Sequence, residues 1–186
     1  MTTSSRPETA TRIAVLACGV LEWNIDRLRD EIPETVELVV DVLPAALHNN
    51  PRRMRELLQE KIDSLSEGPL LDGIVLGFGV CGRGTVGLHA RSVPLVLPKV
   101  QDCIGIFLGS HERYLEQFTE RPGTRYMTHG WYEKTVRHRP RDSFMTPRED
   151  SLYGPQYRDL AGRYGEENAR FIVDFRESWK RNYQRA

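Results

Sequence analysis

The alternation of short apolar runs with helix-type spacing is the feature that most limits the folds open to this chain. Apolar runs that predict buried strands occupy residues 12–18, 36–43, 72–78 and 93–97, and a weaker run covers 124–128. Between them, apolar residues recur at helical spacing over 21–32, 51–66 and 104–118. Strands that alternate with helices form mainly parallel sheets. We therefore predict an α/β fold with a doubly wound, mainly parallel sheet of about five strands.

The chain of 186 residues is expected to form one domain. Residues 1–11 are polar and are expected to be a disordered lead-in, and residues 12–133 are expected to be the α/β core. Residues 134–186 are predicted to add a loop and a C-terminal helical segment over 160–183 to that domain. The apolar stripe of this segment is expected either to pack on the domain or to mediate formation of a homo-oligomer.

Charge and hydropathy exclude several function classes. The chain has 26 basic and 26 acidic residues, so no net charge steers it to nucleic acid or to an anionic membrane. It has no apolar run long enough to cross a bilayer, and residues 1–11 lack the apolar segment of a signal peptide. We therefore expect a cytoplasmic protein that acts on a small molecule, with no nucleic-acid partner and no membrane partner.

The chain contains three cysteines, and each of them follows a predicted strand. Cys18 ends the first strand, Cys81 lies just beyond the third, and Cys103 lies a few residues beyond the fourth. Because parallel strands end at a common edge, the three thiols are predicted to converge there. An odd number of cysteines without an export signal argues against a disulfide framework. Buried structural cysteines are the alternative, since cysteine also packs as a small apolar residue.

Three convergent thiolates predict a metal centre. Zinc takes cysteine and histidine ligands, and a catalytic zinc keeps one position for water or substrate. A [4Fe–4S] cluster is the alternative, because cysteine thiolates hold it as well. His48 follows the second strand on the same edge and is the best fourth ligand, its ordinary alternative being an exposed or helix-capping residue. A catalytic form would be a metal-dependent transferase or lyase, but the residues do not decide whether turnover occurs.

Two carboxylates are candidates for catalysis. Asp102 precedes Cys103 and is placed to orient a ligand or to move a proton. Glu22 lies one turn into the first predicted helix, near Cys18, where it would be a base. Its ordinary role in that position is to stabilise the N-terminus of the helix.

Glycines after the third strand match a dinucleotide-binding pattern. Gly77-x-Gly79-x-x-Gly82 has its spacing, which makes Gly79 and Gly82 candidate cofactor-binding residues. Gly84 and Gly87 interrupt the helix that should follow, and the same turn would also suit another anion. A nucleotide-binding regulatory module therefore stays as one alternative.

Metal-free cysteine chemistry is a further alternative. Two opposed thiols in an α/β crevice act as an acid/base pair in amino-acid racemases. Gly79-Val80-Cys81-Gly82 faintly resembles the second cysteine motif of those enzymes, but the threonine and histidine that should follow are absent.

Motifs spread along residues 12–176 resemble the family called domain of unknown function 1638. They are Ala17-Cys18-Gly19, Leu47-His48-Asn49-Asn50-Pro51, Leu76 to Gly82, Pro98 to Ile104, Leu108-Gly109-Ser110 with Tyr114, and Gly130-Trp131. The resemblance implies that the cysteines and the His48 motif belong to the family pattern. It also implies a setting in methylamine or corrinoid-linked one-carbon metabolism, with a corrinoid or methyltransferase protein as partner. Gln101 departs from the pattern, which is expected to have histidine there, and the family has no assigned activity.

Overall fold

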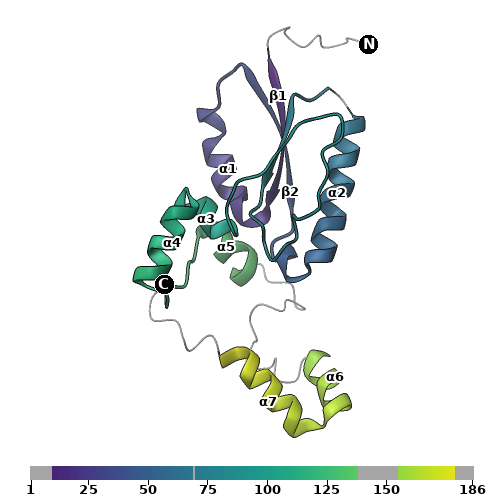
Figure 1. The fold of residues 1–186 in the computed structure, drawn as a ribbon, viewed down its shortest axis with the longest axis vertical. Coiled ribbons are helices and arrows are strands. Elements are labelled where there is room, and N and C mark those ends of the chain that lie inside the picture. The colour runs from purple at the N-terminus through teal and green to yellow at the C-terminus, as the bar shows by residue number, and fades with distance from the viewer. Residues whose placement is uncertain (1–9, 69, 138–154, 179–186) are drawn as a thin grey trace.

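A four-stranded parallel sheet forms the centre of the protein. The computed structural model describes residues 10–68, 70–137 and 155–178. The strands are β1 (Thr11–Cys18), β2 (Val36–Leu43), β3 (Gly73–Gly77) and β4 (Leu95–Val96), in the order β2-β1-β3-β4. Figure 1 shows α1 (Glu22–Leu28) and α2 (Pro51–Glu67) on opposite sides of this sheet. The predicted α/β fold with a parallel, doubly wound sheet is confirmed.

The order of the strands places a topological switch point between β1 and β3. The chain leaves β1 for β2 on one side and returns to pair β3 with the other side of β1, in parallel each time. In such sheets, ligands bind beyond the carboxyl ends of the strands at the switch point. The fold therefore directs attention to the segments that follow β1, β2 and β3.

The core lies between α2 and the sheet. Met54, Leu58 and Ile62 are fully buried and recur every four residues, which places them on one face of α2. Leu16 of β1 and Leu76 of β3 are also fully buried and belong to the same apolar cluster. Asn50 caps α2 by accepting a hydrogen bond from the Arg53 N–H at 3.0 Å, so the helix begins where the sequence predicts.

The predicted fifth strand over 124–128 does not form, and the sheet has four strands rather than five. The β4 edge offers little backbone for a fifth strand to pair with, because β4 is only two residues long, with Pro94 before it and Pro98 shortly after it. In addition, the Thr128 hydroxyl accepts a hydrogen bond from the Trp131 N–H at 3.1 Å and caps α5 (His129–Tyr132). Thr128 is thus the N-cap of a helix rather than the end of a strand.

The predicted helix over 104–118 is two helices. The first, α3 (Cys103–Leu108), ends at Gly109, whose φ of 86° belongs to the left-handed region. Ser110 then caps α4 (His111–Glu120) by accepting a hydrogen bond from the Arg113 N–H at 3.1 Å. The glycine and the cap together turn the chain. The apolar residues predicted to form one helical stripe are therefore divided between α3 and α4.

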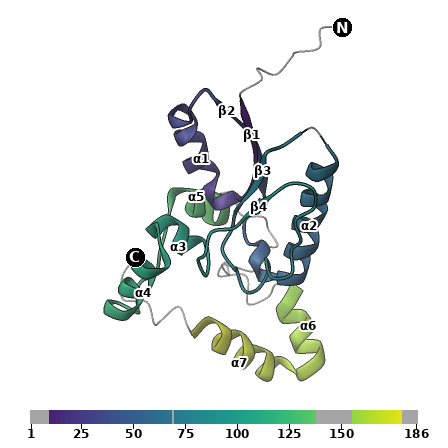
Figure 2. The same ribbon diagram turned by 45° about the horizontal axis from the view of Figure 1, so that its top comes forward.

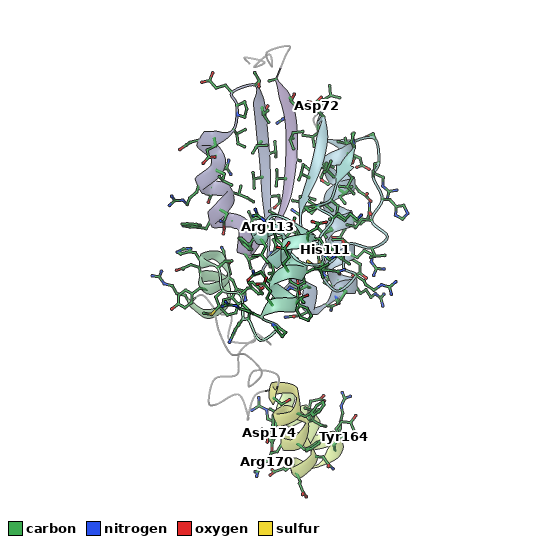
Figure 3. All side chains as sticks on the ribbon, turned by 60° about the vertical axis from the view of Figure 1, so that its left-hand side comes forward. Asp72, His111, Arg113, Tyr164, Arg170 and Asp174 are labelled. Atoms are coloured by element: carbon green, nitrogen blue, oxygen red, sulfur yellow. The ribbon has the colours of Figure 1, made fainter. Side chains whose placement is uncertain are left out.

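The C-terminal helical segment is a hairpin rather than one helix. It consists of α6 (Pro155–Tyr164) and α7 (Glu166–Glu177), joined at Gly165 with φ of 81°. Figure 3 shows the hairpin, with Tyr164, Arg170 and Asp174 labelled, beyond the end of the core that carries α4. Residues 133–137 form a π-helical turn where the prediction has the start of a loop, and the rest of that loop, 138–154, lies outside the described residues.

Short 3-10 turns complete the described chain. They are Gly19–Leu21, Arg29–Glu31 and Leu47–Asn49. The predicted disordered lead-in falls mostly outside the described residues, but its last residue, Thr11, already pairs with Val36 in the sheet. Within the described ranges, none of the helices combines the length and apolar character needed to cross a membrane.

Candidate metal centre

The structure brings Cys18, Cys81, Cys103 and His48 to one small cavity at the carboxyl end of the sheet. The cavity has a volume of about 10 Å³, and its remaining walls are Leu47, Met54 and Phe78. Cys18 is 7% exposed and Cys81 is 8% exposed, whereas Cys103 is half-buried. All three cysteines are free thiols. The convergence predicted for residues far apart in the sequence is therefore present in the fold.

Two adjacent loops carry Cys81 and Cys103. Beyond the end of β3, the Val80 N–H donates to the Val100 carbonyl at 3.0 Å, and the Cys81 N–H donates to the Gln101 carbonyl at 2.8 Å. These bonds continue the β3–β4 pairing past the last residues of the strands. The loops approach so closely that a Cβ on Gly79 would lie 2.6 Å from the backbone nitrogen of Asp102. Gly79 is thus required for its small size.

The backbone around Cys81 is a left-handed turn. Three successive residues have positive φ, namely Cys81 at 47°, Gly82 at 62° and Arg83 at 72°. The left-handed conformation costs a non-glycine residue about 1 kcal/mol or more, so the turn stores strain at two positions. It is held by the Gly84 N–H, which donates to the Cys81 carbonyl at 3.1 Å, and by the buried Thr85 hydroxyl, which donates to the Gly79 carbonyl at 3.2 Å.

His48 reaches the cavity from the connection between β2 and α2. Ala46 has a left-handed φ of 67°, and the 3-10 turn Leu47–Asn49 follows it. The turn lies against the Cys81 turn, since a Cβ on Gly82 would be 3.8 Å from the His48 carbonyl oxygen. His48 borders the cavity but is itself exposed, so it forms the solvent side of the centre.

Asp102 caps the helix that begins with Cys103. Its carboxylate accepts hydrogen bonds from the Ile104 N–H at 2.9 Å and the Gly105 N–H at 3.4 Å. This cap fixes the first turn of α3, and with it the position of Cys103. Asp102 does not line the cavity, but its charge acts on Cys81, Cys103 and His48. The predicted orienting role is compatible with this position.

Burial dominates the electrostatics of the thiols. It raises the pKa of Cys18, and it raises the pKa of Cys81 to about 11 and that of Cys103 to about 12. For Cys81 and Cys103, negative charge on a neighbouring cysteine and on Asp102 contributes to the same rise in pKa, after burial. The thiols are therefore near enough to repel one another when ionised, and all three are neutral near pH 7 without a cation.

The electrostatics of His48 favour a neutral imidazole. Partial burial lowers its pKa, and the negative charge of Asp102 partly opposes that effect. A neutral imidazole is the form that binds metal ions.

The four side chains share a cavity without surrounding one point. In the part of the chain that the structure describes, no group of three or more histidine, cysteine, aspartate or glutamate side chains has the arrangement of a ready-made metal site. Binding of an ion here would require the side chains to close in by rotation.

The other predicted site residues lie away from the cavity walls. Glu22 forms an ion pair with Lys134, which joins α1 to the π-helical turn after α5. Gly82 is exposed in the left-handed turn, and no helix begins there, since residues 81–87 are turns. The dinucleotide pattern depends on a helix N-terminus at this point. Gly79 serves the contact between the two cysteine loops.

Sequence reasoning missed the parts of the centre that are not ligands. Met54 was expected in the apolar face of a helix, but nothing in the pattern places its thioether in the cavity wall. Thr85, which is 5% exposed, lies in a stretch of glycines that gives no sign of a buried hydroxyl. Only its hydrogen bond to the Gly79 carbonyl, which ties the Cys81 turn to the segment after β3, reveals its role.

A family model described as a protein of unknown function, DUF1638, matches residues 42–186. The matched residues include His48, Cys81 and Cys103, and Cys18 precedes them. No curated protein and no solved structure matches the chain.

Proposed function

The chain belongs to the DUF1638 family, whose description names no activity, and we propose that it is a metal-binding protein with a Cys3His centre. One observation carries the proposal: the only three cysteines of the chain and His48 line the same cavity. Cys18, Cys81 and Cys103 supply three thiolates, and His48 supplies the fourth ligand. Thiolate and imidazole are the ligands that zinc prefers.

The size of the cavity favours a single zinc ion over an iron–sulfur cluster. Its volume of about 10 Å³ is near that of one water-sized sphere, which suits one ion. A [4Fe–4S] cluster fills several times that space and is most often held by four cysteines, whereas this chain has three.

The raised thiol pKa values count against the metal-free alternative. A cysteine acid/base pair needs one of its two thiols ionised near pH 7, but burial raises the pKa of both Cys81 and Cys103. A bound cation reverses this effect, because coordination deprotonates a thiol outright.

We also propose a cytoplasmic location, where thiols stay reduced, and a small-molecule substrate. Whether the centre turns a substrate over, as a metal-dependent transferase or lyase would, is left open by the residues and stays a prediction. Asp102 is the residue we assign to orienting ligands. The predicted homo-oligomer and the corrinoid-linked or methyltransferase partner rest on the sequence alone and stay predictions.

Anaerobic purification followed by elemental analysis for Zn, Fe, Co and Ni tests the proposal. We expect about one zinc per chain in the wild type and little or none in Cys81→Ser. Met54→Leu is the matched control, because it changes another sulfur-bearing cavity wall and zinc does not require a thioether. Folded wild-type protein that takes up none of these metals, even when they are supplied, would exclude the centre.

A further inference from the structure

The four proposed ligands differ in their access to solvent. Cys18 and Cys81 are less than a tenth exposed, and Cys103 is half-buried at the start of α3. His48 is the exposed member of the set and is carried by a 3-10 turn rather than by a strand end or a helix. Of the four proposed ligands, His48 therefore has the most open path into solvent if it dissociates from the metal.

The space for an incoming molecule lies on the same side. The metal cavity, at about 10 Å³, has no room for a substrate beside an ion. A hollow of about 300 Å³ adjoins it, lined by Ala45, Ala46, Leu47, Asn49 and Asn50. Leu47 borders both spaces, and His48 lies within the turn that forms the hollow. The volume is at the lower end of the range for small-molecule sites.

Charge limits what can bind at this position. Three thiolates around a divalent ion leave one net negative charge, and the nearby Asp102 carboxylate adds another. Exchange of neutral imidazole for a neutral donor leaves this charge unchanged. Exchange for an anion adds a third negative charge close to the other two, which is unfavourable.

Resting on the proposed function, we infer that His48 is the exchangeable ligand of the centre, and that the incoming molecule is a small neutral nitrogen or sulfur donor. The hollow of residues 45–50 would receive the donor, which would take the coordination position that His48 gives up, one neutral ligand replacing another. No proton or electron moves in this step. The three cysteines remain bound throughout.

Cobalt substitution tests this inference without an activity assay. Metal-free protein is given one equivalent of Co²⁺ anaerobically, and the visible spectrum is recorded for wild type, His48→Ala and His89→Ala. We expect His48→Ala to keep the thiolate-to-cobalt charge-transfer band and to change its ligand-field bands. Added imidazole should restore the wild-type spectrum, and the same concentration of azide should not. His89→Ala, which changes an exposed histidine that does not line the cavity, should match the wild type.

Metal release gives a second readout. We expect a chelator to remove the metal from His48→Ala at least about 10-fold faster than from wild type, and imidazole to slow it again. A His48→Ala spectrum and release rate identical to wild type would overturn the inference while leaving a cysteine-bound metal in place. Restoration by azide but not by imidazole would overturn the neutral-donor assignment. Wild-type protein that binds neither Co²⁺ nor Zn²⁺ would instead refute the proposed function.

Discussion

The two ends of the sheet differ in the conformation of their backbone. At the amino end, the Asp72 carboxylate accepts a hydrogen bond from the Arg12 N–H at 2.6 Å, and none of the described non-glycine residues there has a positive φ. At the carboxyl end lie Ala46, Cys81 and Arg83, which are the non-glycine residues with positive φ in the described part of the chain. Figure 3 shows the separation, with Asp72 at one end of the sheet and His111 and Arg113 of α4 at the other.

The strain lies where the proposed ligands gather. Ala46 precedes the His48 turn, Cys81 is a ligand, and Arg83 completes the Cys81 turn. Strained backbone persists only where the surrounding structure holds it, and it concentrates at functional sites. The difference between the ends is that the described non-glycine residues with positive φ lie beside the proposed centre, as expected if the proposed function belongs to that end of the sheet.

The largest effect is expected from Gly79→Ala. A Cβ there would meet the backbone of Asp102 at 2.6 Å, so the loops carrying Cys81 and Cys103 must separate. We expect the free energy of unfolding to fall by about 3 kcal/mol and the bound metal to be lost. Urea unfolding and elemental analysis measure the two effects.

The control for Gly79→Ala is Gly162→Ala, in exposed α6, where a Cβ has nothing within 4 Å. Its metal content should not change, and its free energy of unfolding should rise slightly. If Gly79→Ala folds and still binds metal, then metal binding does not depend on the close approach of the loops that carry Cys81 and Cys103.

The buried thiols at the carboxyl end of the sheet predict a pH dependence of stability at alkaline pH. Burial raises the pKa of Cys81 from 9.0 to about 11, so the unfolded chain loses this proton at lower pH than the native protein. Metal-free protein should thus be fully stabilised by this neutral thiol below pH 9.0 and lose that stabilisation as the pH rises to about 11. The loss is about 1.4 kcal/mol per pH unit.

Comparison of wild type with Cys81→Ser isolates the contribution of this thiol. Urea unfolding of both metal-free proteins across that pH range should give a shallower decline for the variant. Zinc-loaded wild type should show no such thiol-dependent decline, because its thiols are already ionised. Equal slopes for the two metal-free proteins would mean that Cys81 is not shielded from solvent.

A smaller effect is expected from Asp72→Ala at the amino end. It removes the acceptor of the Arg12 N–H, which should lower the free energy of unfolding by about 1 kcal/mol. Metal content should stay at the wild-type value, and Asp72→Asn, which keeps an acceptor oxygen, should lie between the two proteins. Loss of metal in Asp72→Ala would contradict the division of roles between the ends.

The sequence predicts the amino end and the core of this fold better than its carboxyl end. Strand and helix patterns depend on apolar spacing, so β2 and the start of α2 fall where predicted. The prediction of a fifth strand was wrong because strand propensity is a local property. It does not show that β4, between two prolines, is too short to offer a partner. The helix over 104–118 was wrong because Gly109 and Ser110 interrupt an unbroken apolar stripe.

The sequence predicts which residues belong to the candidate site, but it does not predict how the loops that carry them are arranged. Chain order placed Cys18, Cys81 and His48 at one edge, since parallel strands end together. The left-handed turn at Cys81 and the contact of Gly79 with Asp102 depend on how two loops pack, which no local pattern encodes. Figure 2 shows how segments distant in the sequence meet beyond the strand ends.

The smallest effect is expected from relief of strain at the carboxyl end. Arg83 is exposed with φ of 72°, a conformation that costs an arginine about 1 kcal/mol or more and glycine almost nothing. Arg83→Gly should therefore raise the free energy of unfolding, by less than about 1 kcal/mol because glycine also gains entropy in the unfolded chain.

Arg55→Gly is the matched control for Arg83→Gly, since exposed Arg55 lies within α2. There the same exchange should lower the free energy of unfolding by about 1 kcal/mol, because glycine is a poor helix former. Opposite signs in urea unfolding would confirm that the Cys81 turn holds its arginine under strain. If both variants lose stability equally, the turn is unstrained, and the contrast between the two ends of the sheet then rests on the cysteines alone.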